Sequence, residues 1–393
     1  MIARTLATTL RRLARDYPVV TVTGPRQSGK TTLCRAAFPR RAYVSLEPID
    51  TRDFATQDPR GFLAQYGDGA IIDEVQHAPE LTSYLQAEVD ERPEPGRFIL
   101  TGSQHFGLTA TVAQSLAGRA AVLVLLPPSL DEIHRFPRPP VDLFSTLWTG
   151  AYPRIHDRRL PPNRWLADYV TTYLQRDVRQ VLNVADLEAF TTFLRLCAGR
   201  TAQEVNLSTL GGDAGVSHNT ARAWLSVLEA SFVCFRLPAL HRNLRKQLVK
   251  APKLHFFDAG LTCQLLGIRT PEQLRSHPLR GAIFESWVAA EVYKAAAHRG
   301  QTPRLFHYRE SRGPEVDLIV ERGDSLVLTE VKSGATVADD FFAPLARLAE
   351  TLAPVVGPRR IERRLVYGGD ASQRRSGAHV LPWGQIQSVA WCD

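Results

Sequence analysis

The sequence predicts an α/β protein whose first part is a parallel sheet covered by helices on both faces. Short apolar strands alternate with helical segments in the first third of the chain, which is typical of such a sheet. At 393 residues, the chain is longer than one hydrophobic core usually organises. Near the end, strands and a helix return. We therefore expect three parts: an α/β domain over residues 1–160, a helical segment over 161–278 and a second α/β domain over 279–393.

Five strands are expected in the first domain, each an apolar run that is rich in β-branched residues. They are PVVTVTG (18–24), RAYVSL (41–46), GAIIDEV (69–75), RFILTGS (97–103) and AAVLVLL (120–126). Proline-rich breaks follow between Pro127 and Asn163, and they favour a domain end in that interval.

Composition limits the class of protein. With 44% hydrophobic and 22% charged residues, the chain reads as an ordinary globular protein. The run AAVLVLL is far too short to cross a bilayer, so no membrane association is expected. Five widely spaced cysteines without a CxxC pair fit a reducing cytosol, which predicts a cytoplasmic location. The formal charge of +8 mildly favours anionic partners such as nucleic acid.

A phosphate-binding loop follows the first strand. The stretch GPRQSGKTT satisfies the pattern G-x-x-x-x-G-K-[ST], with a buried strand before it and a helix after it. In such a loop the lysine reaches the phosphates of a nucleotide and the next hydroxyl binds Mg²⁺. The predicted nucleotide-binding residues are Gly24, Pro25, Arg26, Gln27, Ser28, Gly29, Lys30, Thr31 and Thr32.

Three further positions fit nucleotide hydrolysis. Asp73 ends a buried strand and is predicted to hold Mg²⁺ together with Thr31, and Glu74 is predicted to orient or deprotonate the attacking water. Ser103, at the end of another strand, is placed to sense the γ-phosphate or the water. Arg119 is predicted to be a trigger arginine that acts on the nucleotide of its own or a neighbouring subunit.

These motifs resemble the prokaryotic AAA-type ATPases of the AAA+ superfamily whose chains continue into a C-terminal domain of unknown function. The matching stretches are PVVTVTGPRQSGKTTL, GAIIDEVQHAPEL, FILTGSQ, SLAGRA, LPPSLDEI, YVTTYLQRDV, GPEVDLIV and EVKSG. The resemblance implies ATP as the nucleotide and a P-loop NTPase core. AAA-type cores often act between subunits, which favours a homo-oligomer.

The middle segment is predicted to contain a winged helix-turn-helix. Ser217 is expected to cap the second helix of the pair, and VCFRL would be the wing strand. Early residues of such a helix face DNA, here His218, Asn219 and Arg222. A basic cluster between Arg242 and Lys253 adds to the case for nucleic acid, with DNA favoured. The alternative is that the helix pair only packs domains together.

The last domain carries charges within its expected strands. Asp317 lies on the first strand of an expected hairpin, and Glu330 and Lys332 lie two residues apart on the second, which places them on one face. Glu285 lies on the preceding helix. Carboxylates that hold Mg²⁺ next to a lysine suit a metal-dependent phosphodiesterase, with Glu285, Asp317 and Glu330 as ligands and Lys332 as the catalytic cation.

This arrangement resembles the restriction-endonuclease-like, or PD-(D/E)xK, nuclease fold, although Pro314 does not directly precede the acid as in the simplest form of that motif. The sequence thus predicts an ATP-hydrolysing AAA-type ATPase that acts on or is regulated by nucleic acid, with a Mg²⁺-dependent nuclease domain. The alternative is an ATP-dependent switch in which the charges form a salt-bridged core and the inactive nuclease-like domain binds a protein partner.

Overall fold

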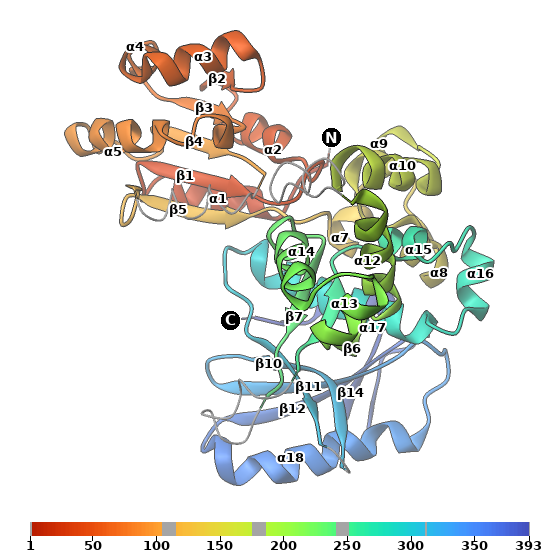
Figure 1. Ribbon diagram of the computed structural model, residues 1–393. Helices are drawn as coiled ribbons and strands as arrows, with labels where there is room; N and C mark the ends of the chain where they lie inside the picture. Colours follow the sequence, from red (N-terminus) through yellow and green to blue (C-terminus); the bar gives the residue numbers. More distant parts are fainter. Residues whose placement is uncertain (1, 104–114, 175–185, 241–250, 311–312, 393) are drawn as a thin grey trace. The chain divides into compact units, whose positions relative to one another are not determined.

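The computed structural model describes residues 2–103, 115–174, 186–240, 251–310 and 313–392 (Figure 1). The chain forms two compact units, which we call the first unit and the second unit. The first holds Met1–Pro128, Ala230–Phe232 and Ala297–Gly300, and the second holds Ser129–Glu229, Val233–Ala296 and Gln301–Asp393. The domain limits at residues 160 and 278 both fall within the second unit, and they stay predictions.

The first unit contains a parallel sheet with the order β2-β3-β4-β1-β5. Its strands are β1 (Val19–Thr23), β2 (Ala42–Ser45), β3 (Ala70–Asp73), β4 (Phe98–Thr101) and β5 (Ala120–Val124). All five lie within the stretches that the sequence predicts. Because the strands are parallel, their carboxyl ends share one edge of the sheet, which is where ligands bind in such folds.

Helices cover both faces of this sheet. On one face are α1 (Leu6–Leu13) and α2 (Lys30–Ala37), and on the other are α3 (Ile49–Gln57), α4 (Pro59–Ala64) and α5 (Leu81–Glu91). The alternation of strand side chains explains the two cores: Ile71 packs with the first group and Ile72 with the second. A short 3₁₀ turn, Val75–His77, follows β3.

The second unit begins with helices that pack into two hydrophobic clusters. The helices are α7 (Leu130–Ile133), α8 (Leu143–Thr149), α9 (Pro153–Arg158), α10 (Pro162–Tyr169) with a π-helical turn Val170–Leu174, α12 (Leu187–Gly199), α13 (Leu207–Asp213), α14 (His218–Ala230), α15 (Ala259–Leu265) and α16 (Pro271–Ser276). A small antiparallel sheet has the order β6-β8-β7, formed by Gln203–Glu204, Lys253–Phe256 and Cys234–Leu237 respectively. The predicted helix pair and following strand are therefore present.

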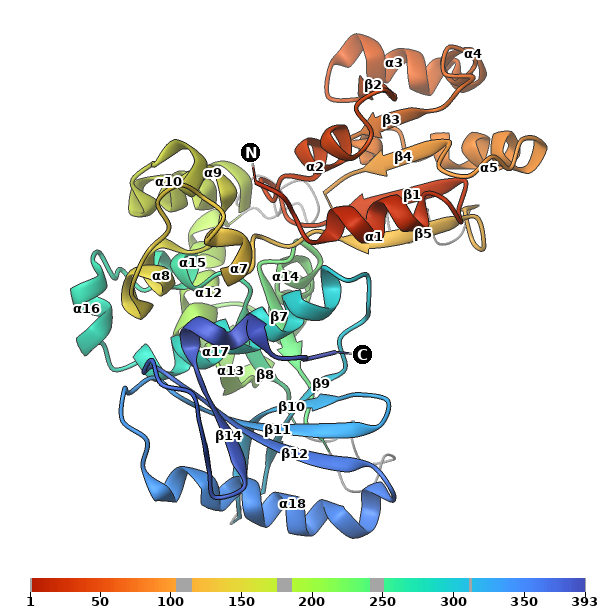
Figure 2. The same ribbon diagram turned by 180° about the vertical axis from the view of Figure 1, so that it is seen from behind.

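A six-stranded mixed sheet ends the chain, with the order β13-β14-β12-β11-β10-β9 (Figures 1 and 2). Its strands are β9 (Leu305–Arg309), β10 (Glu315–Glu321), β11 (Ser325–Lys332), β12 (Arg360–Tyr367), β13 (Gln373–Arg375) and β14 (Ala378–Pro382). The sequence does not predict β13 and β14. Helix α17 (Arg280–Ala297) packs on one face and α18 (Ala343–Val356) on the other, while 3₁₀ turns cover Asp339–Phe342 and Trp383–Ser388.

Within the described ranges, no helix is both long and apolar enough to cross a membrane.

Candidate functional site

The phosphate-binding loop joins β1 to α2, as predicted, and both of its glycines are required by its geometry. Gly24 has a φ of 143°, and a Cβ there would lie 2.2 Å from the carbonyl oxygen of Leu125. Gly29 has a φ of 95° and is the N-cap of α2. Residues other than glycine rarely adopt such backbone angles. Pro25, Arg26, Gln27 and Ser28 fill the loop between them, and Thr31 and Thr32 lie in the first turn of the helix.

Lys30 is buried, and its side chain turns back toward the backbone of its own loop. Its Nζ donates to the carbonyl oxygens of Gly24 at 3.0 Å and Pro25 at 2.9 Å. Burial lowers the pKa of Lys30 to about 8, against the opposing effect of nearby Glu74 and Asp73. The buried Ser28 hydroxyl has no hydrogen-bond partner among the described residues. The Lys30 ammonium group beside the loop backbone, together with the unpaired Ser28 hydroxyl, could bind a phosphate group.

Asp73, at the carboxyl end of β3, is held by three hydroxyl groups. Thr31 Oγ1 lies 3.0 Å from each carboxylate oxygen, and the Tyr43 hydroxyl donates to Oδ2 at 2.9 Å. The buried Thr101 hydroxyl also contacts Oδ1. The structure thus brings together Thr31 and Asp73, the two residues predicted to hold Mg²⁺. A hydroxyl and a carboxylate are oxygen ligands of the kind that Mg²⁺ prefers, so these residues fit the ion.

Glu74 follows in a left-handed conformation, with a φ of 57°. Its carboxylate contacts the Gln76 side-chain amide, and Oε2 lies 3.4 Å from the Ser103 hydroxyl. Gln76 Nε2 is also 3.4 Å from that hydroxyl. Glu74 and Ser103 therefore meet at one edge of the sheet, as expected for residues that end neighbouring strands. Such a group of a base, an amide and a hydroxyl can position a water molecule.

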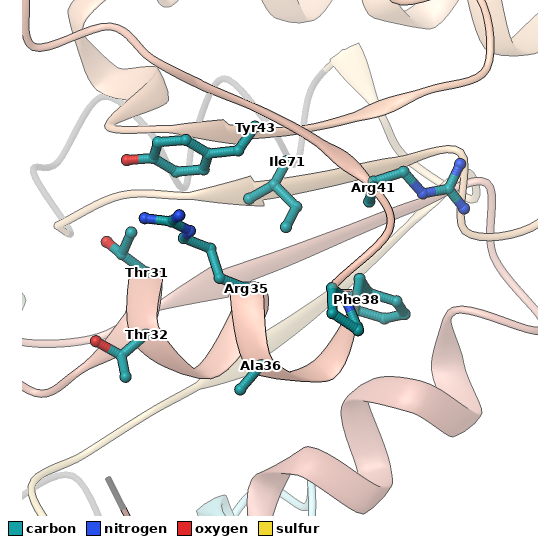
Figure 3. Close-up of a pocket in the computed structure, with 9 residues that line it drawn as sticks. Thr31, Thr32, Arg35, Ala36, Phe38, Arg41, Tyr43 and Ile71 are labelled. Atoms are coloured by element: carbon teal, nitrogen blue, oxygen red, sulfur yellow. The ribbon is translucent and has the colours of Figure 1, made fainter.

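A cavity of about 470 Å³ lies beside the loop, between α2 and β2 (Figure 3). Thr31 and Thr32 line it at one end and Phe38 at the other, and the Arg35 guanidinium lies 4.7 Å from the centre of the Tyr43 ring. Tyr43 therefore joins two features: its ring stacks in this cavity while its hydroxyl holds Asp73. Sequence reasoning missed Tyr43, Thr101 and Gln76 because a single polar residue in a strand or a turn carries no motif.

Arg119 lies at the other edge of the sheet. It directly precedes β5, whose amino end is opposite the carboxyl edge that carries the loop. Its guanidinium donates to Asp90 Oδ2 at 2.8 Å. This position is inconsistent with an action of Arg119 on the nucleotide of the same chain. The amino and carboxyl edges of a parallel sheet are separated by the length of its strands. An action on a neighbouring subunit stays a prediction.

The residues that sequence analysis assigned to a C-terminal site also come together. The β10–β11 hairpin places Asp317 and Glu330 on one face, where both line a cavity of about 490 Å³ with Lys332. Asp317 Oδ2 accepts from the backbone N–H of Val331 at 2.9 Å, and Lys332 Nζ contacts Glu330 Oε1. Burial and the negative charge of Asp317 raise the pKa of Glu330 to about 8.

A second lysine enters this carboxylate cluster from β8: Lys253, which sequence analysis counted in the basic cluster that favours nucleic acid, is buried here and not available to an external anion. Lys253 Nζ lies 2.9 Å from Glu285 Oε1, 2.9 Å from Glu315 Oε1 and 3.8 Å from Asp317 Oδ1. Burial alone would lower the pKa of Lys253, but these carboxylates outweigh it and hold the pKa above its ordinary value. Burial raises the pKa of Glu285 well above its usual range.

This cluster does not fit a metal ion as arranged. Over the described ranges, no three His, Cys, Asp or Glu side chains are grouped so that they could hold one. Glu285, predicted as a metal ligand, instead pairs with Lys253. The roles of Glu285, Asp317 and Glu330 as ligands and of Lys332 as a catalytic cation stay predictions.

The predicted DNA-contacting residues lie at the start of α14. Ser217 caps this helix, since its hydroxyl accepts from the backbone N–H of Thr220 at 3.1 Å. Asn219 and Arg222 are exposed and His218 is half-buried, whereas the opposite face of the helix is buried in the core. Residues 241–250, which hold most of the predicted basic cluster, lie outside the described residues.

Comparison with known proteins gives the family. Residues 16–134 match the family model described as an AAA domain, and residues 141–272 and 280–386 match domains of unknown function, DUF8612 and DUF4143. Uncharacterized protein Rv2008c of Mycobacterium tuberculosis and uncharacterized protein Mb2031c of Mycobacterium bovis are each 30% identical over 342 residues, which cover 85% of this chain and 74% of theirs. The chain belongs to the family of these two proteins. Its first unit carries an AAA-type P-loop ATPase domain.

A solved structure is also similar to this AAA-domain protein. It is the Walker-type ATPase PABY2304 of Pyrococcus abyssi, with a TM-score of 0.44 and 15% identity over 66% of this chain and 94% of that one.

Proposed function

We propose that the AAA domain binds and hydrolyses ATP with Mg²⁺ and that this reaction switches the state of the second unit. The observation that carries the proposal is the meeting of Thr31, Asp73 and Glu74 at the carboxyl edge of one sheet, directly beside the glycine loop. Bound Mg²⁺ would supply charge neutralisation for the phosphates. Lys30 and the loop N–H groups would orient the phosphates, Thr31 and Asp73 would hold the ion, and Glu74 would position the water.

ATP turnover in matched variants tests this proposal. Glu74→Gln is expected to bind ATP but to lose about 10²–10⁴-fold in turnover, because an amide cannot accept the proton of the attacking water. Lys30→Ala is expected to lose ATP binding itself. The exposed Glu80→Gln, on the same segment, serves as the control and is expected to keep wild-type turnover. Wild-type turnover in Glu74→Gln would contradict the assigned role.

Nucleic acid is the favoured target of the switch. The exposed side chains of Asn219 and Arg222 on α14 support this reading, since the opposite face of that helix is used for packing. DNA binding followed by fluorescence anisotropy over a range of salt concentrations is the test. Arg222→Ala is expected to weaken DNA binding. It is also expected to reduce the slope of log binding constant against log salt concentration by about one, as the loss of one phosphate contact does. Arg164→Ala, an exposed arginine on α10, is the control, and equal effects of both changes would contradict a specific contact.

The second candidate function is an ATP-dependent switch whose C-terminal domain cuts nothing and binds a protein partner. Lys253 favours it, because its ammonium group contacts the carboxylates that a nuclease would need for Mg²⁺. A nuclease assay separates the two functions. Mg²⁺-dependent cleavage that is lost in both Asp317→Ala and Glu330→Ala but kept in Lys30→Ala would support the nuclease. ATP turnover without cleavage or salt-dependent DNA binding would support the partner-binding switch.

Subunit contacts belong to the same proposal. Arg119 at the amino edge of the sheet would act only on the nucleotide of a neighbouring copy, which requires a homo-oligomer. Restoration of turnover when Arg119→Ala chains are mixed with Lys30→Ala chains would support this arrangement, and a fully active Arg119→Ala chain would argue against it.

A further inference from the structure

The carboxylate cluster of the second unit contains its own cation. Its acids come from three elements: Glu285 from α17, Glu315 and Asp317 from β10, and Glu330 from β11. Lys253 reaches three of them, Glu285, Glu315 and Asp317, from a fourth element, β8. We propose that Lys253 is the resident cation of this cluster, that it takes the place of a divalent metal ion, and that it excludes such an ion from the site.

The position of Lys253 is fixed by its strand. Its backbone pairs with Glu204 on one side and Leu237 on the other, so β8 is the central strand of its small sheet. Its side chain is 3% exposed, whereas the side chain of Lys332, the other lysine of the cluster, is 35% exposed. A buried ammonium group on a central strand has little freedom to move aside, unlike one at the rim of a cavity. Lys253 and Lys332 therefore differ in how far they are buried and in how freely they can move away from the acids.

At least one oxygen of each carboxylate in the cluster already has a partner. Glu285 Oε1 and Glu315 Oε1 each lie 2.9 Å from Lys253 Nζ, and Asp317 Oδ2 accepts from the Val331 N–H. Glu330 Oε1 contacts Lys332. Magnesium requires six oxygen ligands in a nearly octahedral arrangement, several of which can be water. A divalent ion here would have to compete with a buried ammonium group for the same anions and would be repelled by it.

One buried carboxylate oxygen of the cluster has no partner in the part of the chain that the structure describes. Glu330 Oε2 is buried, has no hydrogen-bond partner among the described residues, and belongs to a side chain that lines the 490 Å³ cavity. A single carboxylate oxygen is too few for a metal site of protein ligands, but it can accept one hydrogen bond from a ligand or water. Two lysines thus pair with the acids of the cluster, and one buried acceptor remains to offer a polar contact.

Manganese binding tests the proposal directly. Mn²⁺ is titrated into the full chain and the free ion is followed by electron paramagnetic resonance, in an Asp73→Asn background that removes the predicted ion site of the AAA domain. With Lys253 present, Glu285→Gln and Asp317→Asn are expected to leave Mn²⁺ binding unchanged. Lys253→Met, which keeps the length and removes the charge, is expected to create a site at least about tenfold tighter than any in its parent, because the freed carboxylates repel one another until a cation binds.

Lys332→Met is the matched control, since it removes the other, more exposed lysine while Lys253 stays in place. It is expected to give less than a tenth of the gain in affinity. The proposal is overturned if Glu285→Gln or Asp317→Asn removes Mn²⁺ binding from the chain that retains Lys253, or if Lys332→Met opens the site as well as Lys253→Met does. It is also overturned if Lys253→Met folds, as judged by near-ultraviolet circular dichroism, and gains no site. Should Lys253→Met fail to fold, the Glu285→Gln and Asp317→Asn titrations alone decide the outcome.

Discussion

Lys30 and Lys253 both lie near carboxylates, and they are held in opposite ways. Lys30 donates to backbone carbonyls of its own loop, and its pKa is lowered by burial. Lys253 is surrounded by carboxylates, which raise its pKa. Asp73 is held by hydroxyl groups that carry no charge. One site therefore keeps its positive and negative groups apart for an external ligand, while the other has joined them. Lysine and carboxylate side chains can therefore form a site that is available to a ligand, when they are kept apart, or one that is occupied by their own ion pairs.

Removing Lys253 gives the largest expected effect. Lys253→Ala leaves buried Glu285 without its partner, which is expected to lower the free energy of unfolding by about 3–5 kcal/mol. The double variant Lys253→Ala with Glu285→Gln removes the uncompensated charge and is expected to recover part of that loss. Urea unfolding of both variants and the wild type provides the measurement. An equal loss in the single and double variants would mean that packing, not charge, makes Lys253 important.

A smaller effect is expected when pH changes the charge of Lys30. The folded, ligand-free chain holds this pKa at about 8, and bound phosphates favour the ammonium form. Below pH 8 the lysine is already charged, so ATP affinity does not depend on it. Above pH 8 binding must take up a proton, and affinity is expected to fall by up to about tenfold per pH unit.

Titration calorimetry at pH 7 and pH 9, in buffers of different ionisation enthalpy, measures this proton uptake. Lys30→Arg is the sharpest control, because a guanidinium stays charged over the whole range and any remaining ATP binding loses the pH dependence. Binding at pH 9 that takes up no proton in the wild type would contradict the assignment to Lys30.

Tyr43→Phe gives the smallest expected effect. It removes one of the hydroxyl groups that hold Asp73 but keeps the ring against Arg35. A lost hydrogen bond to a charged group of this kind costs about 1–2 kcal/mol in positioning, so the Mg²⁺ concentration for half-maximal turnover is expected to rise about fivefold. Tyr84→Phe is the control, because Tyr84 is 38% exposed against 39% for Tyr43 and lies on α5. Unchanged Mg²⁺ dependence in Tyr43→Phe would show that the other hydroxyl groups suffice.

Local patterns were enough to predict much of the fold. The five strands of the first sheet and the loop between β1 and α2 have strong apolar and glycine signals, and they lie where the sequence places them. The period of a strand also predicts that Glu330 and Lys332 share a face, which is confirmed. The short strand β14 was missed because AHVLP has few residues and ends in proline.

Contacts between distant segments could not be predicted in the same way. Lys253 lies on β8, outside the hairpin whose acids it neutralises, and a single lysine in a strand gives no sign of its partners. The same holds for Tyr43, whose hydroxyl reaches Asp73 on the neighbouring strand. The edge at which Arg119 lies, in contrast, follows from its place directly before a parallel strand, and that signal could have been used.

The strand order of the first sheet also sets a sequence of events during protein synthesis. β1 and its loop leave the ribosome early, but β1 pairs only with β4 and β5, which begin at Phe98 and Ala120. Gly24 packs against the backbone of Leu125, which is synthesised after both of these strands begin. The native surroundings of the phosphate-binding loop are therefore complete only after β5 has emerged. Until then the apolar β1 remains an unpaired strand edge, which makes this interval the one in which the growing chain most needs protection from aggregation.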